Sequence, residues 1–274
     1  MSNQNDEFST GFSTQKSTDL STEFSTGKEN IMKIKIEPEQ KQVVAKKNSF
    51  IQTTKYEMGA QQLKLLLYMM SKIKPTDKEF TRNTYKVSDL CAIIDIENVT
   101  INRRLVYKAL EQIRDSGFYY KIDGVYRYSG WVSAFEPNDA QDEVTIEFDE
   151  VLAPYLLNLT EAYTLYDYSV ITELQSKYAI RLYELIKSYS NIGQFIISIE
   201  DLKQLLKVDG YTDYKDFKKR ILVQALCEIN ETTDIYVTYE PIREGRHITK
   251  ISFVILFGSK RKELSKKKEN KENE

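Results

Sequence analysis

Two stretches of this sequence, set 116 positions apart, repeat the same apolar pattern at helical spacing. An α-helix turns by about 100° per residue, so the apolar residues of each stretch fall within one half of its circumference. The two sets are Ile101, Leu105, Val106, Ala109, Leu110 and Ile113, and Phe217, Ile221, Leu222, Ala225, Leu226 and Ile229. Each stretch therefore predicts an amphipathic helix that packs one face against a core.

The neighbours of these two helices also repeat, in the same order. The matching segments are a long helix at 61–73 and 176–189, a short strand leading into a short helix at 87–94 and 199–206, and a strand–turn–strand at 117–135 and 234–257. Asp123-Gly124 and Gly245 are expected in the two hairpin turns. This order is typical of the winged-helix variant of the helix-turn-helix. The sequence therefore predicts an α+β fold of two tandem winged-helix domains related by internal duplication.

We expect the first winged-helix domain over residues 46–150 and the second over residues 151–258. Residues 1–45 form a low-complexity arm in which Phe-Ser-Thr occurs three times, and residues 259–274 form a charged tail. Such compositions bury too little apolar surface to offset the entropy of ordering the chain. Both end segments are therefore expected to be disordered.

The residue content argues against several classes of function. The single histidine, His247, excludes a paired-histidine metal centre, including that of strand-nicking initiators, and the two distant cysteines match no zinc or redox spacing. We find no phosphate-binding loop, dinucleotide fingerprint or nucleophile elbow. We therefore expect no catalytic residue, no metal and no cofactor, and we regard an enzyme as the weaker hypothesis.

Charge and hydropathy limit the partners and the locations that we expect for the protein. No stretch is long and apolar enough to span a membrane, and the polar start lacks the apolar core of a signal peptide, so we expect a cytoplasmic protein. The formal net charge is −2 and the isoelectric point is about 5.8. A nucleic-acid site must therefore come from local clusters of basic residues.

The later basic helix carries all its cations in its first half, as Lys215, Lys218, Lys219 and Arg220. A recognition helix buries one face against its own domain and presents the other to the major groove near its N-terminus, where the helix carries partial positive charge. Asp213 or Thr212 is expected to cap this end. The distribution of charge therefore predicts a DNA-recognition helix.

The helical wheel assigns a role to each polar side chain of this helix. Lys219, Arg220 and Gln224 point away from the apolar face and suit guanine edges, phosphates and adenine edges respectively. Lys215 is expected to reach a phosphate. Lys218 falls near the middle of the apolar arc, where we expect it to snorkel or to pack by its stem, and we assign it no base contact.

Three further groups of side chains are candidates for DNA contact, on the first basic helix, on the C-terminal hairpin and on the helix at 176–189. They are Arg103, Arg104 and Lys108; Arg243, Arg246, His247 and Lys250; and Lys177 and Arg181. Paired arginines around a glycine turn suit contact with the DNA backbone or the minor groove. A solvated charged face is the alternative for these clusters, and for Lys177 and Arg181 solvation at the core edge is an equal alternative.

Three segments of the second half resemble the pattern of iteron-binding, theta-replicating plasmid replication initiators. They are YAIRLYELIKSY, ISIEDLKQLL and FKKRILVQALCEINETTDIYVTYEPIREGRHITKISFVI. The first half resembles that family more loosely, through KKNSFIQTTKYEMGAQQLKLLLYMMSKI. The resemblance covers about residues 46 to 257, and the Phe-Ser-Thr arm is not part of the family pattern.

The resemblance implies a function that the residue spacing does not. Such proteins bind direct repeats at a plasmid origin as monomers, help to melt the adjacent duplex, and assist loading of the host replication initiator and helicase. Their dimers bind an inverted operator repeat and repress their own gene. The second domain makes the stronger sequence-specific contact, the first contributes dimerisation and further DNA contacts, and no cofactor is needed.

Two other functions remain open from the sequence. A two-domain winged-helix transcriptional repressor would share every physical feature described above, because operator and origin are read by the same surface. Direct repeats near the gene, as opposed to a palindrome alone, would separate the two. A strand-nicking enzyme is disfavoured by the lone histidine.

Overall fold

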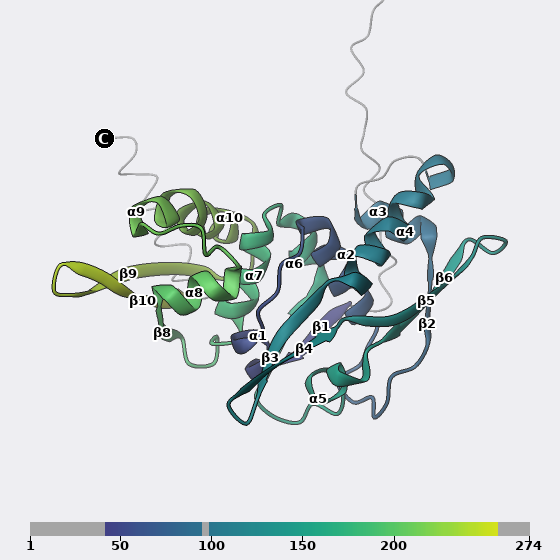
Figure 1. Ribbon diagram of the computed structural model, residues 1–274, viewed down its shortest axis with the longest axis horizontal. Coiled ribbons are helices and arrows are strands. Elements are labelled where there is room, and N and C mark those ends of the chain that lie inside the picture. The colour runs from purple at the N-terminus through teal and green to yellow at the C-terminus, as the bar shows by residue number, and fades with distance from the viewer. Residues whose placement is uncertain (1–41, 95–98, 257–274) are drawn as a thin grey trace, which may run out of the picture. The chain divides into compact units, whose positions relative to one another are not determined.

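The computed structural model describes residues 42–94 and 99–256 (Figure 1). The predicted arm, apart from residues 42–45, and the predicted tail lie outside this range. In the second half, the helix α7 (Lys177–Lys187) is followed by the strand β8 (Gln194–Ser198) and the short helix α8 (Ile199–Leu206). The basic helix follows as α9 (Tyr214–Phe217), η2 (Lys218–Leu222) and α10 (Val223–Thr232). The hairpin of β9 (Tyr236–Glu244) and β10 (His247–Leu256) completes the predicted order.

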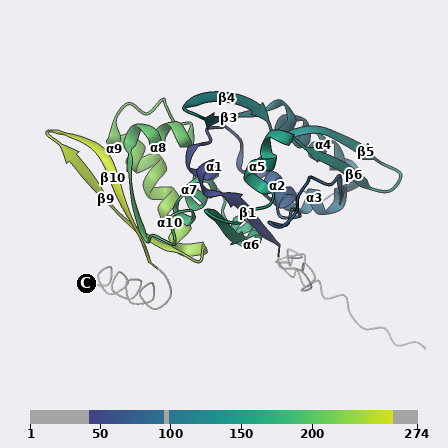
Figure 2. The same ribbon diagram turned by 90° about the horizontal axis from the view of Figure 1, so that it is seen from below.

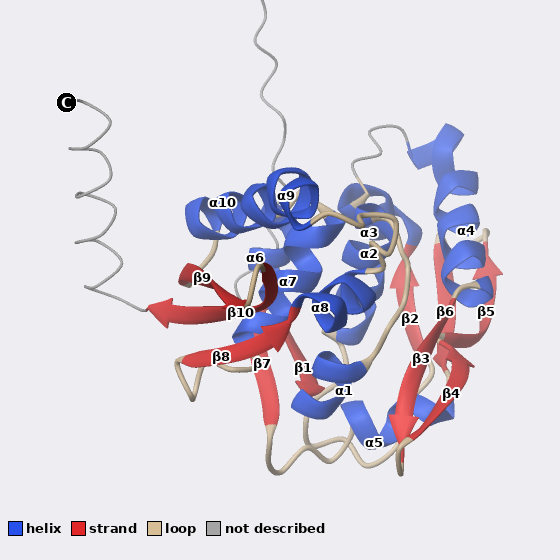
Figure 3. Cartoon of the chain, turned by 60° about the vertical axis from the view of Figure 1, so that its left-hand side comes forward, coloured by secondary structure: helices blue, strands red, loops and turns tan. Residues whose placement is uncertain are grey.

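The first half contains the same elements in the same order. They are α2 (Ala60–Met70), β2 (Asn83–Lys86), α3 (Val87–Ile93), α4 (Val99–Asp115), β5 (Val132–Asn138) and β6 (Glu143–Phe148). Two antiparallel sheets of matching strand order, β2-β6-β5 and β8-β10-β9, complete the two winged-helix domains (Figure 3). Two winged-helix domains related by duplication are thus confirmed.

The predicted hairpin at 117–135 forms, but it is not the wing of the first domain. Its strands are β3 (Gly117–Ile122) and β4 (Val125–Gly130), which pair with each other around Asp123 and Gly124, both at positive φ. The wing strand next to β2 is β6, so the hairpin is an insertion that the second domain lacks between α10 and β9. The prediction was wrong here because Asp-Gly is a strong local turn signal, whereas the pairing of β2 with β6 joins distant residues.

Each half also begins with a strand and a short helix that the sequence analysis did not predict. These pairs are β1 (Val43–Lys47) with α1 (Asn48–Thr53), and β7 (Tyr163–Asp167) with α6 (Tyr168–Glu173). The two strands pair antiparallel with each other, with Ala45 opposite Leu165. A 3-10 turn, η1 (Glu150–Leu152), and a short helix, α5 (Ala153–Leu156), precede β7. The predicted domain boundary between residues 150 and 151 stays a prediction.

The helix α2 lies at the centre of the core. All of its residues from Leu63 to Met70 are buried, and a helix that is buried around its whole circumference must have packing partners on every side. Those partners include α4, β1, α6 and α7 (Figure 2). The first helices of the two domains, α2 and α7, therefore pack directly against each other.

A cluster of three charged side chains is buried beside this contact. Lys46 of β1 forms an ion pair with Glu184 of α7, and the two side chains are 3% and 0% exposed. Arg181, also on α7, has Nη1 3.6 Å from Oε2 of Glu184. Nη2 of Arg181 donates to the carbonyl oxygen of Thr54 at 2.9 Å and Nη1 to the hydroxyl of Tyr56 at 2.7 Å. Burial lowers the pKa of Lys46, and the carboxylate of Glu184 opposes that shift.

We expect Glu184→Gln to lower the free energy of unfolding by about 3–5 kcal/mol, because it leaves two buried cations without a counter-charge. The matched control is Glu143→Gln, which breaks the exposed pair between Lys86 and Glu143 and should change stability little. Urea unfolding followed by circular dichroism measures both variants. Equal stability of the two variants would contradict the role given to Glu184.

Candidate nucleic-acid interface

The N-terminal end of the basic helix is capped as predicted. Oδ1 of Asp213 accepts a hydrogen bond from the backbone nitrogen of Lys215 at 2.9 Å. Of the two predicted caps, Asp213 and not Thr212 therefore fills this role. The cap fixes the helix end at which the cations gather, and the carboxylate of Asp216 in the first turn also favours it.

The helix contains a π-helical turn at Lys218–Leu222, and this changes the orientation of one predicted side chain. The helical wheel placed Lys218 in the middle of the apolar arc. In the structure Lys218 is exposed, while Phe217, Ile221 and Leu222 on either side of it are buried. The placement within the apolar arc was wrong because a π turn contains more residues than the assumed 3.6, whereas the expectation that Lys218 makes no base contact stays a prediction. Lys218 therefore joins the exposed cations at this end of the helix.

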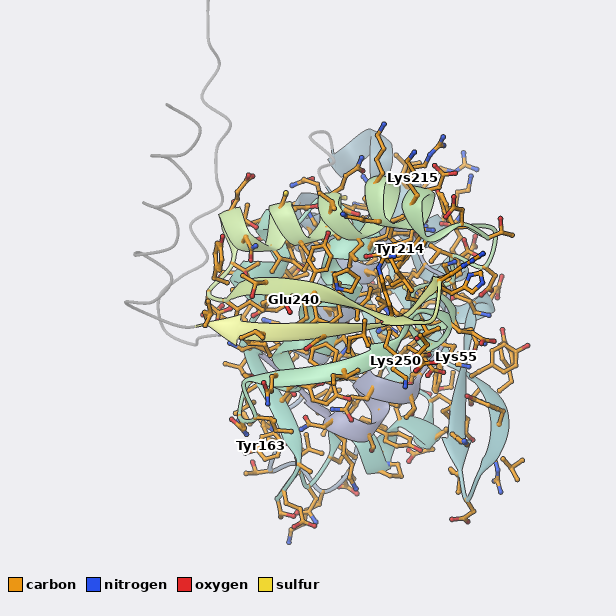
Figure 4. The ribbon with its side chains drawn as sticks, turned by 90° about the vertical axis from the view of Figure 1, so that its left-hand side faces the viewer. Lys55, Tyr163, Tyr214, Lys215, Glu240 and Lys250 are labelled. Atoms are coloured by element: carbon orange, nitrogen blue, oxygen red, sulfur yellow. The ribbon has the colours of Figure 1, made fainter. Side chains whose placement is uncertain are left out.

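A groove separates the start of the basic helix from the wing. It is a hollow of about 400 Å³ lined by Ile199, Lys203, Thr212, Asp213, Tyr214, Lys215, Arg243, Arg246, His247 and Ile248. Figure 4 shows Lys215 on the helix and Lys250 on the neighbouring strand, both toward the right of that view. Four predicted residues, Lys215, Arg243, Arg246 and His247, thus line one hollow, although two separate elements supply them.

Lys203 lines this groove and was missed by the sequence analysis. Its ammonium group donates to the backbone oxygens of Tyr211 and Thr212 in the loop before the basic helix, and it lies 5.5 Å from the ring centre of Phe217. Lys203 therefore ties α8 to the start of the basic helix and adds positive charge to the groove. Its place on the first helix of a helix-turn-helix, which crosses the DNA backbone in that motif, was the available signal.

The remaining candidates on the basic helix and on the C-terminal wing are exposed, as predicted. Lys219, Arg220 and Gln224 lie on the exposed face of the helix. On the wing, Gly245 takes a φ of 65° in the hairpin turn, a left-handed conformation that favours glycine. Next to it, Lys250 pairs with Glu244 at 2.8 Å. The contact of these residues with DNA stays a prediction.

The first domain presents a weaker basic surface than the pattern of cations suggests. Arg104 and Lys108 are exposed, but Arg103 pairs with Asp139 and Asp142 of the β5–β6 turn, both at 3.0 Å. The hydrogen bond from Tyr107, followed by that from Arg103, lowers the pKa of Asp139, so the carboxylate stays ionised. The wing of this domain therefore carries acidic residues where the second wing carries arginines.

One apolar position of the first basic helix departs from the predicted pattern. Leu105 is 49% exposed, whereas its counterpart in the repeat, Ile221, is buried. Ile101 lies outside the residues whose side chains the structure describes. The exposed face of α4 therefore combines Leu105 with Arg104 and Lys108.

The two candidates on α7 are less exposed than those on the basic helix and on the wing. Arg181 is only 5% exposed and belongs to the buried cluster, so its assignment as a phosphate contact was wrong. Residue spacing is compatible with a place for Arg181 at the core edge because it does not reveal a buried counter-charge. Lys177 is partly exposed and pairs with Glu57 at 3.3 Å.

Within the described residues, no cluster of three or more histidine, cysteine, aspartate or glutamate side chains could hold a metal ion. Over the same residues, no helix is long and apolar enough to cross a membrane.

The comparison with known protein families identifies the chain. Residues 43–187 match the family described as initiator replication protein, WH1, and residues 198–255 match initiator Rep protein, WH2. The chain belongs to the initiator replication protein family. The WH1 match runs from β1 through α7 and the WH2 match from the end of β8 through β10, so β7, α6 and α7 fall within the WH1 match of this Rep protein.

Individual relatives of this Rep protein come from Escherichia coli. The PI protein is 31% identical over 144 residues, which cover 45% of this chain and 46% of that protein, so the match spans about half the relative's length. An uncharacterized 27.6 kDa protein is 24% identical over 170 residues, covering 61% of this chain and 71% of the relative. These matches support the family assignment.

One solved structure shares the fold of this Rep protein. It is the crystal structure of the Pi initiator protein in complex with iteron DNA, with a TM-score of 0.63 and 20% identity over 80% of this chain and 98% of that chain. The similarity shows that the two proteins have the same fold.

The cap at Asp213 gives a test of the site's construction. We expect Asp213→Ala to lower the free energy of unfolding by about 1 kcal/mol, because a backbone donor at the helix end loses its acceptor. Asp209→Ala, in the exposed loop before the cap, makes the same change of charge and is the control. Thermal unfolding should separate the two, and equal midpoints would show that the cap does not stabilise this end.

Proposed function

We propose that this Rep protein is a plasmid replication initiator that binds direct repeats, or iterons, as double-stranded DNA at the plasmid origin. The observation that carries the proposal is the basic groove of the second domain, in which the capped helix end and the arginine-bearing wing face the same hollow. Membership of the initiator family supports it, as does the fold shared with an initiator whose structure contains iteron DNA.

The second domain is the main reader in this proposal. The N-terminal part of its basic helix enters the major groove, where Lys219, Arg220 and Gln224 face base edges and phosphates. The wing follows the adjacent backbone or minor groove through Arg243 and Arg246. Lys215 and Lys218, which are both exposed, lie close enough to the helix end to reach phosphates. The partial positive charge of the helix end favours the same phosphates.

The first domain makes the weaker DNA contact and the contacts with a second copy of the chain. Its recognition helix offers Arg104 and Lys108, while Arg103 is occupied by the acidic turn of its own wing. Dimers are proposed to bind an inverted operator repeat and repress the gene, and monomers to bind the origin. The host replication initiator and helicase are the proposed protein partners, the location is the cytoplasm, and no catalytic step is assigned.

The first test is binding to labelled duplexes that tile the DNA flanking the gene. We expect tight binding at direct repeats as well as at the inverted operator repeat, with log affinity falling against log salt by about 0.9 per phosphate contacted. Lys215→Ala should reduce that slope by about 1. Fluorescence anisotropy across a salt series measures both. A flat salt dependence would show that the basic clusters do not face DNA. Binding confined to a palindrome would contradict the initiator function and favour a repressor.

The second test compares the two recognition helices. Arg220→Ala and Lys219→Ala should lower discrimination between the repeat and a scrambled duplex, by about 1–3 kcal/mol for a lost base contact. Arg104→Ala, at the corresponding position of the repeat, should lower affinity for both duplexes and leave their ratio nearly unchanged. The assignment of the second domain as main reader is wrong if only Arg104→Ala collapses that ratio.

A further inference from the structure

The buried cluster of Lys46, Arg181 and Glu184 needs an explanation beyond stability. All three side chains are at most 6% exposed. Removing charges from water costs free energy that their mutual attraction often only offsets, and apolar replacements of buried ion clusters are frequently as stable or more so. What a buried ion pair does supply is a preference for one arrangement over its competitors, because a misaligned arrangement leaves charges buried and unpaired.

The cluster lies where an alternative arrangement is easy to form. The strands β1 and β7 make a two-stranded ribbon, which on its own fixes its register weakly. In the observed register Lys46 lies opposite Thr164, and both side chains are buried. A slip by one residue would turn Lys46 to the opposite face of the ribbon, away from Glu184. The ion pair therefore penalises every odd-numbered slip.

The cluster joins α7 to two separate segments of the chain before α2. Lys46 belongs to β1, whereas the guanidinium of Arg181 binds the segment after α1 and stacks 3.9 Å from the ring centre of Tyr56. The hydroxyl of Tyr166, on β7, also donates to Glu184. Arg181 and Glu184 lie one turn apart on α7, so a single helix face receives all of these contacts.

This helix face is connected by packed elements to both recognition helices. On one side, α7 packs against α10, which continues the basic helix of the second domain. On the other side, β1 packs against α2, and α2 packs against α4 of the first domain. The cluster is thus the polar link in a continuous series of packed elements from one reader to the other.

We propose that the Lys46–Glu184–Arg181 cluster positions the two recognition helices relative to each other and so sets the spacing of the DNA segments that the protein accepts. The inference rests on the proposed function, because it takes both domains to bind one duplex. Linked sites gain affinity only where both can engage together, and the gain is lost where the geometry forbids it. A rigid link makes that gain depend steeply on spacing, and a loose link does not.

The test variant is the double substitution Lys46→Met with Glu184→Gln. It removes one charge of each sign, while the amide at position 184 can still accept from Tyr166, and Arg181 keeps Thr54 and Tyr56. The matched control is Lys86→Met with Glu143→Gln, which makes the same chemical change in an exposed pair of the first domain, 2.8 Å apart. Arg181→Lys is a second variant, which keeps the charge but loses the forked contacts with Thr54 and Tyr56.

The probes are the repeat protected by the native full-length protein and the same duplex with one, two or three base pairs inserted between the segments that each domain protects. Two inserted pairs rotate one segment by about 70° relative to the other. On this insertion the affinity of the native and control proteins should fall on the order of a hundredfold. That is the size of the affinity gain that is lost when two linked domains can no longer bind together. The double variant should lose about tenfold or less, and Arg181→Lys should lie between.

A purely structural role for the cluster would weaken binding to every probe by the same factor. The inference is therefore overturned if all the proteins show the same dependence on insertion, or if the native protein binds the inserted and uninserted repeats equally. It is also overturned if the double variant unfolds and Arg181→Lys, still folded, keeps the native profile. If the native protein does not prefer the repeat to a scrambled duplex, the proposed function fails as well, and that result is distinct from the others.

Discussion

A lysine–glutamate pair sealed between the two halves of the protein is the contact on which the arrangement of the rest depends. Lys46 and Glu184 come from distant parts of the chain, and neither has solvent to stabilise its charge. Their pairing fixes which strand register, which face of α7 and which orientation of Arg181 are compatible with a folded protein. The apolar helix α2 then packs between elements whose positions are already set.

The two domains share the order of their core elements and the strand order of their sheets, and the charges on their turns distinguish them. The second wing ends in Arg243 and Arg246 around a glycine, and its groove stays open toward the basic helix. The first wing ends in Asp139 and Asp142, which occupy Arg103. The same scaffold thus carries one strong and one weakened basic surface, and the difference lies in a few side chains of a turn.

The sequence predicted those parts of the fold that depend on local pattern. Helices with strong apolar periodicity and a capping residue, such as the one that begins after Asp213, were found within a few residues. The pairing of β1 with β7 and of β2 with β6 was missed, because strand partners are set by tertiary packing and not by local composition. The same holds for two residues of the candidate site. Lys218 is exposed because it lies in a π turn, and Arg181 is buried beside the carboxylate of Glu184. Residue spacing predicts neither position.

The pairing of β1 with β7 also determines when this protein can finish folding during its synthesis. The strand β1 is made early, but its partner strand and Glu184 emerge only after more than a hundred further residues have been added. At about 5–20 residues per second, this leaves β1 waiting on the order of ten seconds. During that time β1 has no strand partner and its edge is exposed. Lys46, which is buried in the folded protein, has no counter-charge during the same period. The first winged helix therefore cannot reach its final state until β7 and α7 have also been made.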